Sequence, residues 1–454
     1  MIEERDRMDL DEAKRMAEGT VRRARAAGAE LVEASVVEHL VVEVEVRKDA
    51  IEKLTESVSN SLGLTVAVDK RRANVLSSDL SQESIDQLIG QGIELARVMD
   101  RDDYFDLPAL EELGTVETDL ELFDPATLAI TTEERIELAR ALERAALAMD
   151  GRIISDGSAA TSTVRTIAFA NSLGFCEGFR RSSNALVVSC AVEDTPQRSE
   201  NIGKKQSAGW YSRAISPRSL EPVEMIAAKA VQRTLRKLGA RKPRTCEAPV
   251  VFDTETASQL LESIANAVGG GNIYRKSSFL VDRLGSVIGS QLLTIIDDAL
   301  MPARLGSRPF DHEGVRSRRN VVLRRGTLES YLMSSYHARK LGLATTGNAG
   351  GHSNLYIEPG EAAPEAIIAS VAEGLYLTSL SGPGANWTTG DFSQGAQGLW
   401  IERGEIAYPV DEFTIASTFP EMLAGIEMIG NDIDWRDPLA APTIKIGRMI
   451  VSGT

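Results

Sequence analysis

Three of the four histidines in the chain, His312, His337 and His352, lie within one stretch of about forty residues. Imidazole groups can bind a metal ion or transfer protons, and Glu313 adds a carboxylate beside the first of them. Their spacing matches neither H-E-x-x-H nor a zinc-finger pattern. A metal site built from these four side chains therefore requires the fold to bring them together.

Other residue types with possible chemistry are few. Asp297 and Asp298 end an apolar, strand-like run, which is a usual place for function and also an ordinary strand terminus. His39 lies at the edge of an apolar run, and we expect it to be structural. No G-x-S-x-G nucleophile motif occurs. We expect buried thiols, because free cysteine is usually buried, at three widely spaced positions: Cys176, Cys190 and Cys246.

Two glycine clusters could suggest nucleotide binding, but neither has the order that a phosphate site needs. Gly269–Gly271 follows the helix predicted over Thr254–Val268, whereas a phosphate loop precedes a helix N-terminus. This cluster is interpreted as a helix stop. Thr346–Gly351 lacks the Lys-Ser/Thr ending of a P-loop and predicts a tight loop that approaches other backbone or a bound peptide.

Composition limits the class of protein. The 454 residues are 43% hydrophobic and 26% charged, which is typical of a globular chain with two large domains. No run of about 18 apolar residues occurs, and residues 1–19 lack a signal-peptide core, so we expect no membrane span and a cytoplasmic location. The net charge of −16 argues against nucleic-acid binding. We expect the basic run Arg316–Arg325 to be a solvated strand face.

The N-terminal half alternates between helical and strand-like patterns. Apolar residues recur with helical spacing in four segments, Leu10–Ala27, Ser81–Met99, Thr132–Met149 and Leu220–Leu238. A period of two predicts an antiparallel meander over Leu31–Leu76 and two further strands over Ser158–Ala170 and Gly174–Glu193. We expect a long connection over Arg101–Ala129 and a mobile loop over Arg198–Ser216.

The basic segment Ala240–Arg244 is the predicted domain boundary, which gives domains of residues 1–239 and 245–454. The second half predicts mostly strands with a few helices. The predicted fold class is therefore α+β: an N-terminal α/β domain with an antiparallel sheet, and a C-terminal domain that is mostly β.

Several strings of the second half resemble the TldD/PmbA family, the bacterial and archaeal group once called modulators of DNA gyrase. In chain order these strings are SSFLVDRLGSVIGSQLLTIIDD (277–298), PFDHEG (309–314), GTLESYLMSSYHARKLGLATTGNAGG (326–351), TGDFSQGAQGLWIERGEI (389–406) and PTIKIGRMIVSG (442–453). The N-terminal pattern also fits, so the resemblance covers nearly the whole chain.

The resemblance implies a two-subunit peptidase in which TldD binds zinc through an H-E-x-x-x-H helix and a distant Cys, whereas PmbA, also called TldE, lacks these ligands. Here Leu261 and Asn266 stand at the two His positions, Glu262 alone is retained, and no Cys follows Cys246. Catalytic zinc needs about three protein ligands. The resemblance therefore implies a non-catalytic PmbA/TldE-type subunit without a cofactor, which assembles with a zinc-containing TldD-type partner.

The glycine-rich segments suit backbone hydrogen bonds to a peptide of loose sequence. The expected peptide groove is formed by Gly347, Asn348, Gly350, Gly390 and Asp391. Two alternatives stay open. One is an autonomous metallopeptidase that uses the non-standard His and Glu site described above, and the other is a non-enzymatic regulator that binds peptides as a homodimer.

Overall fold

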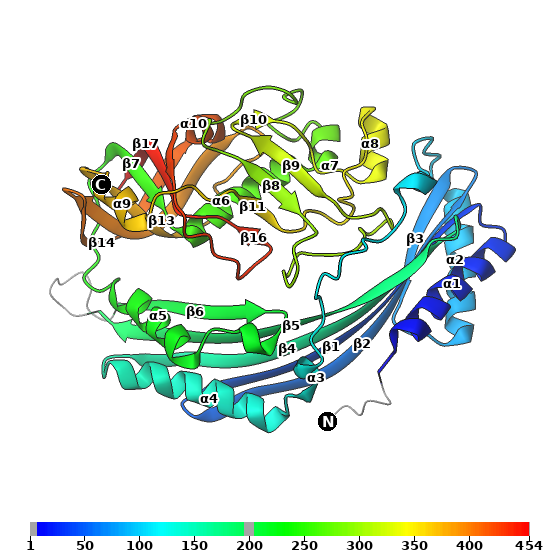
Figure 1. The fold of residues 1–454 in the computed structure, drawn as a ribbon, viewed down its shortest axis with the longest axis horizontal. Helices are drawn as coiled ribbons and strands as arrows, with labels where there is room; N and C mark the ends of the chain where they lie inside the picture. Colours follow the sequence, from blue (N-terminus) through cyan, green and yellow to red (C-terminus); the bar gives the residue numbers. More distant parts are fainter. Residues whose placement is uncertain (1–6, 195–203, 454) are drawn as a thin grey trace.

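A computed structural model describes residues 7–194 and 204–453. In this structure a long, curved sheet forms a cradle, and a β-rich C-terminal unit lies over its inner face (Figure 1). The predicted α+β class, with an N-terminal antiparallel sheet and a β-rich C-terminal part, is confirmed. None of the helices in the described part of the chain is long and apolar enough to cross a membrane.

The cradle is a six-stranded sheet in the order β3-β2-β1-β4-β5-β6, and all neighbouring strands are antiparallel. Burial alternates at every residue of β1 because successive side chains point to opposite faces. The strands are β1 Leu31–Arg47, β2 Ala50–Val68, β3 Arg71–Ser77, β4 Ile154–Asn171, β5 Cys176–Glu193 and β6 Lys205–Ala214.

Helices cover only the outer face of this sheet (Figure 1). Val32 and Val36 of β1 pack in the apolar cluster with α1 and α2, and Val44 and Val46 pack in the cluster with α4 and α5. The odd-numbered side chains of β1 therefore face the C-terminal unit. The helices are α1 Leu10–Ala26, α2 Gln82–Val98, α3 Ala126–Ala129, α4 Thr132–Met149 and α5 Val223–Leu235, with 3-10 turns at Leu110–Glu112 and Pro217–Ser219.

The prediction of a loop over Arg198–Ser216 is wrong where the structure describes it. Residues 198–203 lie outside the described residues, but Lys205–Ala214 forms the edge strand β6, paired with β5. The Gln, Ser, Ala and Gly residues of β6 weaken the alternation of apolar and polar residues that would predict a strand. Gly209 is required because a Cβ there would lie 2.7 Å from the Val188 carbonyl oxygen, and Trp210 packs in the core beneath α5.

The C-terminal unit contains a sheet in the order β14-β13-β12-β7-β17-β15, and a further pairing of β14 with β17 closes it into a barrel. A second sheet has the order β10-β9-β8-β11-β16. The barrel strands are β7 Cys246–Phe252, β12 Glu373–Ser381, β13 Asp391–Glu402, β14 Glu405–Thr418, β15 Ile426–Ile429 and β17 Ile444–Ser452. The others are β8 Ile295–Asp298, β9 Arg319–Arg324, β10 Thr327–Leu328, β11 Leu355–Ile357 and β16 Leu439–Ala440.

One large apolar core, with Phe252, Trp400 and Phe419 among its fully buried side chains, joins the two C-terminal sheets to α6. The helices of this unit are α6 Thr254–Ala267, α7 Gly270–Tyr274, α8 Ser335–Leu341, α9 Pro364–Ala369 and α10 Phe419–Ala424. The Gly269–Gly271 cluster, predicted only to stop a helix, also begins α7. A Cβ on Gly270 would lie 2.7 Å from the Met333 side chain.

The connection that follows α2 binds the C-terminal unit to the sheet. The Gly114 amide donates to the Gly314 carbonyl at 3.2 Å, and the Arg316 amide donates to the Glu112 carbonyl at 2.9 Å. Arg339 of α8 donates to several carbonyls of the same connection. These contacts hold the loops of the C-terminal unit against the inner face of the cradle.

Candidate functional site

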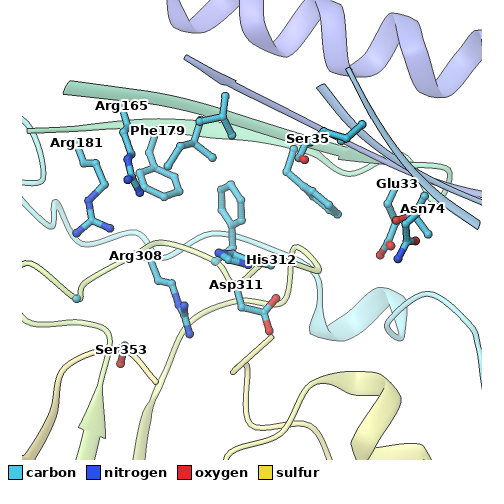
Figure 2. A pocket seen from close by; sticks show the side chains of 18 of the residues that line it. Glu33, Ser35, Asn74, Arg165, Phe179, Arg181, Arg308, Asp311, His312 and Ser353 are labelled. Atoms are coloured by element: carbon cyan, nitrogen blue, oxygen red, sulfur yellow. The ribbon is translucent and has the colours of Figure 1, made fainter. Parts of the chain in front are cut away.

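A cavity of about 760 Å³ lies between the inner face of the cradle and the loops of the C-terminal unit. Figure 2 shows that side chains from both parts of the chain point into it. Its volume falls within the range of about 300–1,000 Å³ that is usual for ligand sites. Its charged and histidine lining residues are Glu33, Arg165, Arg181, Arg308, Asp311, His312 and His352.

Arginines form one end of the cavity. Arg165 of β4 lies directly opposite Arg181 of β5 in the antiparallel register, and Arg308 approaches from the C-terminal unit (Figure 2). Arg181 donates to the Leu305 carbonyl, and Arg308 donates to the Gly351 carbonyl at 2.6 Å. Burial, together with the neighbouring arginine charges, lowers the pKa of Arg181 to about 10.

Aromatic rings stand beside these arginines. Phe179 precedes Arg181 by two residues on β5, so both side chains point to the same face of the sheet. The Phe310 ring of the C-terminal unit meets the Phe179 ring edge to face, with centroids 5.5 Å apart. Phe175 packs against Phe310 in the same way at 5.3 Å. The cavity therefore combines positive charge with an apolar wall.

Two carboxyl groups line another part of the cavity. Asp311 accepts hydrogen bonds from the amides of Glu313 and Ala349, both at 2.9 Å. Burial, followed by the charge of Glu313, raises the pKa of Asp311 to about 6. The same two causes raise the pKa of Glu33 to about 8. Desolvation and the charge of Arg308 lower the pKa of His312, which lies between these carboxyls and the arginines (Figure 2).

The predicted tight loop at 346–351 is present, and it supports the cavity instead of lining it. Gly347 and Gly350 have φ of 70° and 89°. A Cβ on Gly350 would lie 2.3 Å from Nδ1 of His312, so glycine allows this ring to pack on the loop. The loop amides from 346 to 349, and that of Gly351, already donate within the protein. Asn348 donates to Asp297 at 2.7 Å.

The other part of the predicted peptide groove has different neighbours. Gly390 packs against Phe279 and Pro420, and Asp391 begins β13. Because β13 pairs with β12 on one side and β14 on the other, much of its backbone is already hydrogen bonded. A groove through Gly347, Asn348, Gly350, Gly390 and Asp391 stays a prediction.

The four side chains of the alternative metal site are divided between two places: His312 and His352 line the cavity, and Glu313 and His337 lie at the start of α8. His312 points into the cavity, whereas His337 of α8 lies 2.9 Å from the Ser334 hydroxyl through Nδ1. Glu313 accepts from the Ser335 amide at 2.8 Å. Across residues 7–194 and 204–453, no three His, Cys, Asp or Glu side chains are grouped as a metal site requires.

The residues of α6 do not fit the zinc site that the resemblance assigns to TldD. Leu261 is 0% exposed within the C-terminal core, whereas Glu262 is exposed. Asn266 donates its side-chain amide to the Glu262 carbonyl at 3.0 Å. The solvent-facing side of α6 lines a second cavity of about 470 Å³, to which it contributes Thr254, Glu255, Ser258, Gln259 and Glu262. This face of α6 carries neither His nor Cys, whereas His352 lines the same cavity from the loop before β11.

The remaining candidates have structural contacts. Asp297 is 1% exposed and accepts from the Ser353 amide at 2.6 Å, so its carboxylate holds the loop that precedes β11. Asp298 pairs with Arg319. His39 lies opposite Arg165 in the sheet, and burial lowers its pKa. The expectation of buried thiols holds for Cys190 alone, since Cys176 and Cys246 are half-buried, and desolvation raises the pKa of all three.

Sequence reasoning missed the residues that define the cavity. Arg165, Arg181 and Glu33 match no motif, although each lies on the inner face of its strand. The available signal was the pattern Arg-x-Ile-x-Phe at 165–169 and Phe-x-Arg at 179–181, which places arginine and aromatic rings on one face.

Three models of one protein family match this chain in order. They are described as PmbA/TldA metallopeptidase domain 1, central domain and C-terminal domain, and they match residues 32–96, 126–238 and 245–453.

Individual relatives agree with this match. Metalloprotease PmbA of Escherichia coli O157:H7 is 35% identical over 91% of this chain and 90% of its own. A metalloprotease TldD homolog of Haemophilus influenzae is 27% identical over 67% of this chain and 66% of its own. The crystal structure of a "putative modulator of DNA gyrase" from Bacteroides thetaiotaomicron superposes with a TM-score of 0.91 at 26% identity and covers 100% of both chains. The chain therefore belongs to the PmbA/TldD metallopeptidase family.

Proposed function

We propose that this chain is the non-catalytic, PmbA/TldE-type subunit of a two-subunit zinc metallopeptidase that degrades or processes peptides. One observation carries the proposal: the face of α6 that lines a cavity presents Thr, Ser, Gln and Glu, without a His or Cys. Zinc in a catalytic site needs about three nitrogen, sulfur or carboxylate ligands with one open position. The greater identity to PmbA than to the TldD homolog supports the same assignment.

In this proposal the chain contributes a wall of the substrate chamber, and a TldD-type partner contributes the zinc. The cavity between the cradle and the C-terminal unit has apolar rings beside charged and polar groups, a combination that suits a peptide ligand. The relatives are named metalloproteases, which favours one alternative, an autonomous metallopeptidase.

Metal analysis of the purified proteins separates the two candidates. The chain is expressed alone and together with a TldD-type protein from the same cell, and zinc is measured per chain after gel filtration. We expect co-purification, about one zinc per pair, and no stoichiometric zinc on the chain alone. About one zinc on the chain alone would support the autonomous enzyme, and failure to co-purify would contradict the two-subunit assignment.

A further inference from the structure

The two sheet arginines at this end of the cavity carry positive charge that no ion pair among the described residues neutralises. Arg165 and Arg181 are cross-strand partners, and side chains at such positions are separated by only about 5 Å at Cβ. Within the described ranges neither forms an ion pair, and the side-chain hydrogen bond that Arg181 makes goes to the Leu305 carbonyl. Like charges in this position destabilise a sheet. The arrangement is explained if an anionic ligand occupies the space between them.

Arg308 adds a donor that is already desolvated. The residue is 9% exposed, and Nη2 donates to the Gly351 carbonyl. Its Nε is buried, with no hydrogen-bond partner among the described residues. Asp297 and Asp311 offset part of its charge. A buried N–H without an acceptor is unfavourable, and a ligand oxygen would satisfy it.

The apolar residues beside the arginines indicate which chemical group carries the anion. Phe179 points to the same side of β5 as Arg181, and Phe310 closes the wall above it. Ile167 and Phe169 continue this wall along β4 from Arg165. A ligand that places its charge between the arginines therefore has its neighbouring atoms against apolar rings.

We infer that this end of the cavity binds the C-terminal carboxylate of a peptide, with the last apolar side chain against Phe179 and Phe310. Guanidinium groups match a carboxylate with two parallel hydrogen bonds. A multiply charged phosphate is disfavoured because Asp311 lines the same cavity and the chain has a net charge of −16. The inference rests on the proposed function for its ligand class, since that function requires peptides in this chamber.

The test measures binding to the full chain without a partner. A five-residue apolar peptide ending in phenylalanine is prepared once as the free acid and once as the C-terminal amide, and both are titrated by calorimetry. We expect the acid to bind at least tenfold more tightly. Arg181→Gln should weaken the acid at least tenfold and leave the amide unchanged. Arg152→Gln, which removes a distant exposed charge, is the matched control and should change neither.

Equal binding of acid and amide, or no binding of either, would overturn the inference. If the acid and the amide bind equally and millimolar inorganic phosphate competes with them, the inference is also overturned. That result would describe a general anion site. Thermal unfolding of each variant shows whether it is folded, and Arg165→Gln provides a second cavity variant. The assay needs no partner and no zinc, so its failure is distinct from failure of the two-subunit assignment.

Discussion

Arg165 on β4 lies directly opposite Arg181 on β5, and within the described residues no acidic side chain forms an ion pair with either. The relationship joins the two parts of the molecule, because both arginines face the cavity that the C-terminal unit closes. Arg165 is exposed and Arg181 is half-buried, so their mutual repulsion lowers stability modestly, and such a cost is retained where it serves binding. The cavity is therefore assigned to ligand recognition and not to folding.

The first prediction concerns the stability of the empty protein. Arg165→Gln keeps most of the side-chain volume and removes one of the two opposed charges, so we expect the free energy of unfolding to rise by up to about 1 kcal/mol. The gain should shrink at high salt, which screens charge repulsion. Thermal unfolding at low and high ionic strength measures it. A lower unfolding temperature at low salt would show that Arg165 is a structural residue.

The second prediction concerns pH. The carboxyl of Glu33 is desolvated and lies near Glu313, and although Arg72 opposes these effects, its pKa is raised from 4.5 to about 8. Between these values the folded state holds a proton that the unfolded state has lost. Stability contributed by this group therefore falls as the pH rises from about 4.5 to 8. Glu33→Gln removes that loss.

Urea unfolding at pH 5 and pH 8 tests this. The gain in unfolding free energy from Glu33→Gln should be larger at pH 8 by a few kcal/mol at most, on the order that such a pKa difference implies. Glu52→Gln is the control, since the Glu52 side chain is 55% exposed. A gain that is the same at both pH values would contradict the raised pKa.

The third prediction concerns the loop that carries His312. Gly350→Ala should destabilise the protein by several kcal/mol, because φ is 89° and the new Cβ would overlap the imidazole ring. Gly351→Ala is the matched control: φ is 101°, but the space around its Cβ is open, so only backbone strain of about 1–2 kcal/mol is expected. Chemical denaturation compares the two. Equal losses would mean that the His312 contact is not maintained.

The fourth prediction separates the two adjacent carboxylates of β8. Asp297 accepts hydrogen bonds from the Ser353 amide, the Ser353 hydroxyl and the Asn348 side chain. Asp297→Asn replaces one accepting oxygen by an N–H donor that faces another donor, so the free energy of unfolding should fall by about 3 kcal/mol. Asp298→Asn loses mainly a partly exposed pairing with Arg319 and should cost about 1 kcal/mol or less. The reverse order of unfolding midpoints would contradict the structural assignment of Asp297.

The sequence predicts the helices and strands of the N-terminal half well. The reason is that their apolar residues recur at regular spacing and that capping residues mark the helix starts. The predicted helix at Thr132–Met149 has the observed bounds, and a capping box between Thr131 and Glu134 fixes its start. Asp9 and Ser81 cap the starts of α1 and α2 in the same way, through a side-chain oxygen. Such capping signals lie within a few neighbouring residues, so they can be recognised in a single sequence.

The cavity could not be predicted because it depends on register and on contacts between distant segments. Arg165 and Arg181 meet only through the pairing of β4 with β5, and Arg308 reaches them only when the C-terminal unit covers the sheet. The sequence predicts the glycine-rich loop and its close approach to other backbone, but not its packing against His312. The loop amides serve Asp311 and Met333, and this is visible only in three dimensions.

The most direct test of the central claim is a peptidase assay on four samples: the chain alone, the TldD-type partner alone, their complex, and the complex with Glu262→Gln in this chain. Glu262 is the single acidic residue retained at the degenerate motif, and it is exposed on α6. The account predicts cleavage by both complexes at equal rates, abolished by a chelator, and none by this chain alone. Chelator-sensitive cleavage by the chain alone, or loss of activity with Glu262→Gln, would contradict it.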